Sequence, residues 1–100
     1  MTTDDAHRYL IAYDMPDDRR RTRLAKRLLS YGDRLQFSVF IADCKPARLV
    51  RLKLAVGQII VPSDDSVLIC DLGPVRSIDS SRFSFVGRSR PITPLDVIVV

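Results

Sequence analysis

Residues 8–32 read RYLIAYDMPDDRRRTRLAKRLLSYG and predict a strand followed at once by a helix. The strand is the short apolar and aromatic run from Arg8 to Tyr13, which ends at Asp14. Pro16 follows two residues later, as expected where a turn stops a buried strand. Asp14 therefore stands at the end of an apolar strand.

The helix that follows has its own start and stop signals. Asp17 and Asp18 suit a helix N-terminus, where carboxylates cap free amides and favour the dipole, and Gly32 is expected to end the helix. The residues of the apolar stripe are Leu24, Ala25, Leu28 and Leu29. The arginines that fall mostly off this stripe, and should face solvent, are Arg19, Arg20, Arg23 and Arg27.

Two more strands and a second helix can be read beyond this unit. Residues 35–42, LQFSVFIA, alternate as strands do, and Ser38 marks a kink or a switch between two short paired strands. Pro46 fits the first turn of a helix whose apolar arc is wide enough to predict burial on more than one side. Residues 66–72 read as the next strand, SVLICDL.

This order predicts an α+β fold: a βαββαβ sheet with both helices on one face. One hundred residues make a single domain, with a core at about residues 8–72 and a C-terminal strand and tail at 73–100. Phe40 and the even-numbered side chains of the first strand should lie on the bare face or its rim. Residues 83–86 are the candidate short strand, and the apolar end at 96–100 should dock. A bare face and an unpaired tail favour a two-fold dimer.

Composition excludes several classes of protein. With 46% apolar and 28% charged residues, the chain is globular rather than disordered, and no apolar run approaches the roughly 18 residues of a membrane span. The acidic, polar start is unlike a secretory leader, so we expect a cytoplasmic protein. Cys44 and Cys70 are too few for a disulfide scaffold and should be small buried apolar residues. His7 is the only histidine, which disfavours a zinc site or a serine-type triad.

The net charge is +4, and all of it lies between Asp17 and Arg34, where seven cations face three aspartates. This concentration is typical of an electrostatic footprint for a polyanion, although a solvated helix face has the same pattern. Within it, Arg21 and Arg23 are suited to charge-assisted contacts with phosphate. No base-reading motif is present, so nucleic acid should be bound through its backbone.

Asp14 is the candidate catalytic and metal-binding residue, because a carboxylate at the end of an apolar strand needs a reason to be there. It is either a Mg²⁺ ligand or a turn aspartate before Pro16. One carboxylate is a poor magnesium site, but a two-fold dimer would bring two copies of Asp14 together around a metal that activates water. Tyr13, Phe37 and Phe40 are either base-stacking or core aromatics.

Two stretches, YLIAYDMPDDRRRTR at residues 9–23 and GDRLQFSVF at 32–40, together resemble the CRISPR-associated Cas2 family, and the likeness extends over residues 8–72. The resemblance implies a ferredoxin-like homodimer in which Asp14 binds Mg²⁺ or Mn²⁺ at the dimer cleft. It implies metal-dependent cleavage of RNA or double-stranded DNA, and a dimer that bridges the CRISPR integrase and holds DNA during spacer acquisition. It also implies a C-terminal strand that pairs with the partner subunit.

The candidate nucleic-acid-binding or supporting residues, from charge and from the resemblance together, are Tyr13, Arg19, Arg20, Arg21, Arg23, Arg27, Arg34, Ser38 and Phe40. Two functions stand at this point: a structural adaptor in CRISPR adaptation, and a metal-dependent endonuclease of the endoribonuclease type. A toxin-like ribonuclease outside CRISPR is an alternative. A small-ligand regulatory domain on the same fold leaves the arginine-rich helix without a purpose.

Overall fold

A computed structural model describes residues 5–93 and has the predicted order of elements. The elements are β1 (His7–Asp14), α1 (Asp18–Leu29), β2 (Gly32–Gln36), β3 (Val39–Cys44), α2 (Pro46–Gly57) and β4 (Ser66–Pro74). Two short 3₁₀ turns follow at Val75–Ser77 and Ser80–Arg82. Residues 37 and 38 form the turn between β2 and β3, so the predicted switch at Ser38 is confirmed.

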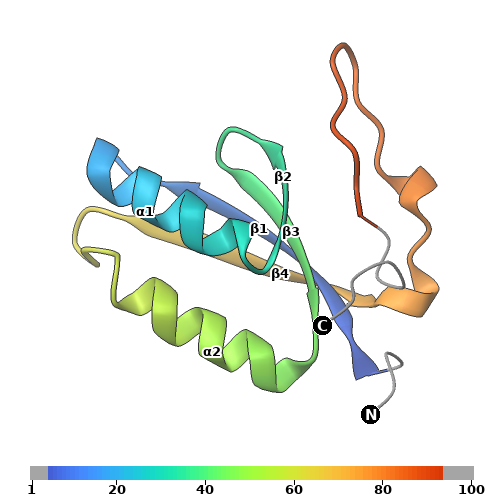
Figure 1. Cartoon of the computed structure of the whole chain (residues 1–100), viewed down its shortest axis with the longest axis horizontal. Coiled ribbons are helices and arrows are strands. Elements are labelled where there is room, and N and C mark those ends of the chain that lie inside the picture. The colour runs from blue at the N-terminus through green and yellow to red at the C-terminus, as the bar shows by residue number, and fades with distance from the viewer. Residues whose placement is uncertain (1–4, 94–100) are drawn as a thin grey trace.

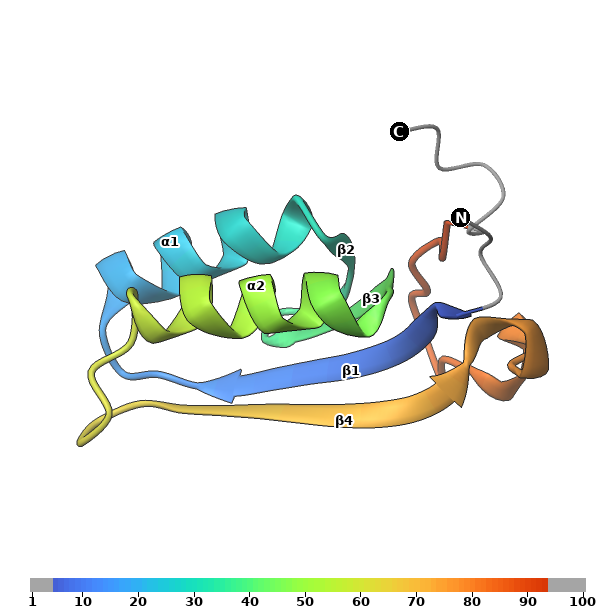
Figure 2. The ribbon, with the colours of Figure 1, turned by 90° about the horizontal axis from the view of Figure 1, so that it is seen from below.

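The four strands form an antiparallel sheet in the order β2-β3-β1-β4. Both helices cover one face of the sheet, as Figures 1 and 2 show, and the other face has no helix. Ile11 in β1 lies opposite Phe40 on one side and Ile69 on the other, so these three side chains share the helix-facing side. This is the ferredoxin-like arrangement that the sequence predicted.

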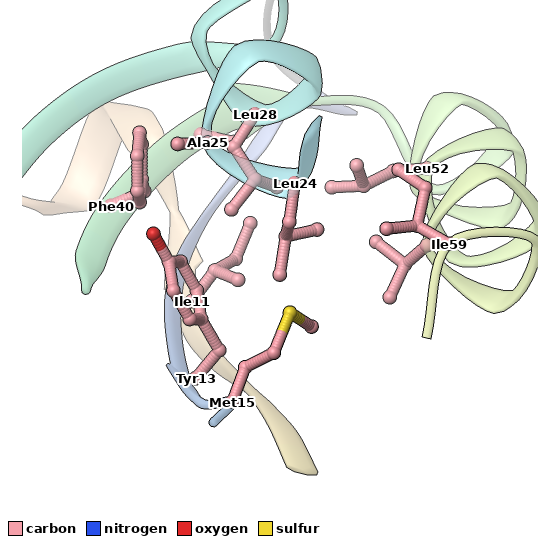
Figure 3. Packing of buried hydrophobic residues seen from close by; sticks show 11 residues of the cluster. Ile11, Tyr13, Met15, Leu24, Ala25, Leu28, Phe40, Leu52 and Ile59 are labelled. Atoms are coloured by element: carbon pink, nitrogen blue, oxygen red, sulfur yellow. The ribbon is translucent and has the colours of Figure 1, made fainter. Parts of the chain in front are cut away.

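The core lies between the sheet and the helices (Figure 3). Its fully buried large side chains are Phe40, Ile11, Leu24, Leu28 and Leu52. The prediction that Phe40 lies on the bare face or its rim is wrong. The register places Phe40 opposite Ile11, whose side chain faces the helices, and its ring lies below α1.

The even-numbered side chains of β1 do face away from the helices, as predicted. Leu10 and Ala12 are half-buried there and Asp14 is exposed. On the neighbouring edge strand, Leu68 is 60% exposed and Cys70 is exposed. Cys44 is buried as expected, but the prediction for Cys70 is wrong, because Cys70 lies opposite Leu10 on the side of the sheet that no helix covers.

Helix α1 begins as predicted but ends earlier. The Asp17 side chain accepts the backbone N–H of Arg20, and Ser30 caps the other end. Gly32 does not end the helix; it is the first residue of β2. A side chain at Gly32 would overlap the backbone of Ile41 and Ala42, so the glycine permits close approach of β2 to β3.

Helix α2 buries Leu52 and Val56 against the core, but Val50 is 57% and Leu54 is 66% exposed. The prediction that this helix is buried on more than one side is therefore wrong for the single chain. Among residues 5–93, no element packs on its outer side (Figure 2).

After β4 the chain continues beyond one end of the sheet (Figure 1). Residues 83–86 form no strand, and β4 is the last strand within residues 5–93. Instead, the Arg8 guanidinium carbon lies 5.7 Å from the centre of the Phe83 ring, and the Thr93 N–H donates to Asp33 at 2.6 Å. The docking predicted for residues 96–100 lies outside the described residues. None of the helices in residues 5–93 is long and apolar enough to span a membrane.

Candidate nucleic-acid and metal site

Asp14 is the last residue of β1 and lies on the bare face of the sheet. It is exposed, and it pairs in register with Ser66, the first residue of β4. Its carboxylate has no hydrogen bond or ion pair with any residue of the described range 5–93. The residue after it, Met15, is buried in the core, which fixes the direction in which β1 ends. Asp14 is thus a free carboxylate on a fixed strand end.

Arg21 shapes the turn that follows Asp14. Its Nη1 donates to the carbonyl oxygens of Met15 at 2.8 Å and Pro16 at 2.9 Å, and its guanidinium also pairs with Asp18. These contacts place a positive charge beside the end of β1. They also commit much of the guanidinium to the protein, so the main effect of Arg21 is to hold the turn.

The turn between β2 and β3 lies against the same end of β1. The Tyr13 N–H donates to the Ser38 carbonyl at 3.1 Å, and the Tyr13 hydroxyl donates to the Phe37 carbonyl at 3.3 Å. Arg34 donates to that same Phe37 carbonyl from Nε at 3.2 Å and from Nη2 at 2.9 Å. The structure thereby brings Tyr13, Arg34 and Ser38 together next to Asp14.

Tyr13 and Phe40 belong to the core, which decides between the two interpretations left open for them. Their exposed fractions are 7% and 1%, and their rings stack with centroids 6.1 Å apart. No nucleobase can reach the face of either ring. Their contribution is to support the strand end, while the third aromatic, Phe37, is 69% exposed at the turn.

Arg20 was predicted to face solvent, and this prediction is wrong because Asp65 binds its guanidinium group. Its Nε and Nη2 donate to Asp65 at 2.7 and 3.0 Å, and the Asp65 side chain has no exposed surface. Asp65 also accepts the Val61 N–H at 2.8 Å. The hydrogen bonds from Arg20 hold the pKa of Asp65 below its ordinary value, and Asp65 raises the pKa of Arg20 in turn. Arg20 therefore ties α1 to the loop before β4.

The remaining cations of α1 stay free. Their side chains are exposed and form no hydrogen bond or ion pair with the other residues between 5 and 93; they are Arg19, Arg23, Lys26 and Arg27. A shallow groove of about 380 Å³ is lined by Arg23, Lys26, Arg27, Ser30 and Ile59. Three cations line this groove and no carboxylate does. The groove is therefore suited to an anionic partner.

Asp14 is the one candidate metal ligand of the predicted site. In the described part of the chain, no three His, Cys, Asp or Glu side chains come together as metal ligands. Mg²⁺ is usually bound by one or two carboxylates together with waters and phosphate oxygens. Asp14, with the hydroxyl-bearing Ser66 beside it, supplies one carboxylate of such a set, and a second copy of the chain would add a second one.

Sequence reasoning gave no site role to Asp65 or Lys26 and left Phe37 undecided. The only sequence signal for Asp65 is its place in the turn before a strand. Phe37 continues the alternation of residues 35–42, so the sequence carries no signal that its ring is exposed. Lys26 was counted in the net charge, but its freedom from partners is visible only in three dimensions.

Residues 7–76 match the family model described as CRISPR associated protein Cas2. Over 94 residues the chain is 35% identical to the CRISPR-associated endoribonuclease Cas2 of Geobacter sulfurreducens, covering 93% of this chain and 98% of that protein. The fold matches the crystal structure of Streptococcus pyogenes Cas2 with a TM-score of 0.71 and 30% identity, over 80% of this chain and 99% of that one. It also matches a chain of a partial Cas6-RT-Cas1–Cas2 complex, with a TM-score of 0.62 and 26% identity, over 89% and 98% of the two chains. A ferredoxin-like fold, an exposed carboxylate at the end of β1 and a basic first helix agree with these matches, and the chain belongs to the CRISPR-associated Cas2 family.

Proposed function

We propose that this chain is a CRISPR adaptation subunit: a cytoplasmic homodimer that holds double-stranded DNA and bridges the CRISPR integrase. The observation that carries the proposal is the set of cations along α1 that have no partner within residues 5–93, together with the free carboxylate of Asp14, in a member of the Cas2 family. The similarity to a chain of a complex that contains Cas1 supports the integrase as partner.

The α1 cations act on the phosphate backbone. Arg19, Arg23 and Arg27 project from a helix, and their guanidinium groups can form charge-assisted contacts with successive phosphates. Arg20 and Arg21 are held by protein groups and position α1 and the turn at Asp14 instead. Since backbone contacts do not report sequence, duplexes of unrelated sequence should bind with similar affinity.

The bare face of the sheet is the proposed dimer surface. Leu68 and Cys70 are exposed on it, and β4 is an edge strand with unpaired backbone groups. Residues 83–86 are the segment proposed to pair with the partner. A two-fold axis near the end of β1 would set the two copies of Asp14 face to face.

Paired Asp14 carboxylates would hold one Mg²⁺ or Mn²⁺ ion. The chemistry that such an ion supplies is activation of a water molecule and polarisation of a phosphodiester. On the protein side, Arg21 and Arg34 would place positive charge at the strand end where the scissile phosphate would lie. Tyr13 helps to hold the turn at Phe37, whose carbonyl also accepts the hydrogen bonds of Arg34. Cleavage of RNA or double-stranded DNA is the second candidate activity, supported by the unpaired state of Asp14 and by the endoribonuclease name of a relative.

Reconstitution with the integrase of the same CRISPR system separates the two activities. The wild-type chain, the integrase and a duplex should elute as one complex in size-exclusion chromatography with light scattering. Asp14→Asn should form that complex unchanged and support integration, while losing any metal-dependent cleavage. If the wild-type chain forms no complex with the integrase or with DNA, the adaptor function is wrong. If rigorously purified Asp14→Asn still cleaves, the nuclease assignment to Asp14 is wrong.

A further inference from the structure

The surface next to the Asp14 site combines an exposed aromatic ring with positive charge. Phe37, at the turn between β2 and β3, is 69% exposed, although large aromatic side chains are normally buried. Beside it runs a groove of about 430 Å³ between this turn and the flank of α1. The charged residues of its lining are Asp18, Arg21, Lys26 and Arg34.

The Phe37 ring is held in place rather than left loose. Its carbonyl oxygen accepts hydrogen bonds from Tyr13 and twice from Arg34, which fixes the backbone at the turn. The Arg34 guanidinium carbon lies 5.5 Å from the centre of the Phe37 ring and 5.1 Å from that of Phe40. Arg34 thus joins an exposed ring to a buried one. The result is a pre-set aromatic surface at the mouth of a groove.

The groove has the charge of an anion site. Arg21, Lys26 and Arg34 outnumber the single carboxylate, Asp18, which is itself paired with Arg21. Lys26 has no hydrogen bond or ion pair among the residues that the structure describes. Its ammonium group and the part of Arg34 that faces away from the Phe37 carbonyl are the groups available to a phosphate.

From this geometry we propose that the groove binds one unpaired nucleotide of a DNA or RNA strand, with its base stacked on Phe37 and its phosphate at Lys26 and Arg34. A ring that offers its face to solvent is the usual partner of an unstacked base, whereas bases within a duplex have their faces covered by one another. The proposal rests on the proposed nucleic-acid function and adds a subsite for one unpaired base, with Phe37 as its stacking residue.

The surface beyond the groove supports a strand rather than a peptide or a second copy of the chain. A neighbouring depression shares Asp18 and Thr22 with the groove and continues to Arg19 and Arg23. A backbone that leaves Phe37 therefore meets free cations on α1. Two copies of the groove would bring like charges together, which disfavours self-association there.

Binding of three fluorescein-labelled DNA probes tests the proposal: a 16-nucleotide single strand, a blunt duplex, and the same duplex with a single-stranded 3′ end. Phe37→Leu keeps an apolar side chain but removes the stacking face, and Phe37→Trp restores it. We expect Phe37→Leu to weaken single-strand and overhang binding roughly 5- to 100-fold and to leave blunt-duplex binding within about twofold, with Trp at the wild-type affinity. Leu54→Ala is the matched control, since Leu54 is 66% exposed on α2, away from the groove.

A second readout places the base itself. The fluorescence of a single strand that contains 2-aminopurine should fall when the strand binds the wild type, because stacking on Phe37 quenches the fluorescent base. The fluorescence should stay unchanged with Phe37→Leu. The proposal is overturned if Phe37→Leu binds all three probes as wild type does, or weakens all three equally. It is also overturned if the variant changes only the monomer–dimer equilibrium, or if an acidic peptide competes while the single strand does not bind. The proposed function itself fails by a different result, namely no binding of the blunt duplex by the wild type.

Discussion

The free cations of α1 lead to a quantitative prediction for DNA binding. The perturbation is Arg19→Gln together with Arg23→Gln, which removes two exposed charges that have no partner within residues 5–93. Folding should be unaffected, because neither side chain belongs to the core cluster. The matched control is Arg51→Gln with Lys53→Gln, which removes the same charge from exposed positions on α2.

The size of the effect follows from counterion release. Each phosphate contact contributes about 0.9 to the slope of log affinity against log salt concentration for duplex DNA. Two lost contacts should reduce the magnitude of the slope by about 1.8 for each chain that contacts the duplex. Between 50 and 200 mM salt, wild type should then lose about 12-fold more affinity than the Arg19/Arg23 variant where one chain of the dimer contacts the duplex, and about 150-fold more where both chains do.

Fluorescence anisotropy with two duplexes of unrelated sequence measures these slopes at four or five salt concentrations. The α1 variant should flatten the slope equally for both duplexes, and the α2 control should keep the wild-type slope. If both variants flattened the salt slope equally, DNA binding would depend on the total charge of the protein rather than on the cations of α1. An unchanged slope in the α1 variant would remove α1 from the interface.

Three further predictions concern stability. Arg8 and Asp43 form an ion pair at 2.7 Å, and their side chains are only 5% and 6% exposed. Arg8→Met should therefore lower the free energy of unfolding, measured in urea, by about 3–5 kcal/mol, and the double variant with Asp43→Leu should recover most of that stability. Equal losses in the single and double variants would contradict a buried pair. The folded protein holds the pKa of Asp65 below its ordinary value of 3.8. Asp65 therefore contributes fully to the stability of the fold above pH 3.8, and this stability is lost as the pH falls through the folded pKa. The stability gap between wild type and Asp65→Asn should therefore narrow from pH 7 to pH 3, and a gap independent of pH would contradict the pairing. Gly32→Ala should lower the melting temperature, because the new Cβ meets the β3 backbone, whereas Gly57→Ala, which meets nothing within 4 Å, should not.

Much of the fold could be predicted because its local signals agree with one another. The apolar run of β1, the cap at Asp17 and Pro46 at the start of α2 each specify an element without reference to the rest of the chain. The order of these elements is compatible with few topologies. The sheet and its single helix-covered face could therefore be predicted from that order.

The errors arose where a residue's environment is set by strands or helices that are distant in sequence. Phe40 was predicted on the wrong face of the sheet, because the face depends on the register between strands. Cys70 was predicted to be buried, but it is exposed because β4 is an edge strand, and edge position is a property of the assembled sheet. Arg20 looked like its neighbours on α1, yet a buried carboxylate 45 residues away binds it. Composition showed that α1 is basic, but it could not separate the arginines that hold the protein together from those left for a ligand.

We propose that two copies of Asp14 share one metal ion, and titration with Mn²⁺ followed by electron paramagnetic resonance tests this proposal. The loss of the free-ion signal on binding gives the stoichiometry for a dimer whose mass is established by light scattering. We expect one Mn²⁺ per two chains, displaced by Mg²⁺, and no such binding by Asp14→Asn. One ion per chain, or binding that survives in Asp14→Asn, would contradict a shared site at the ends of the two β1 strands.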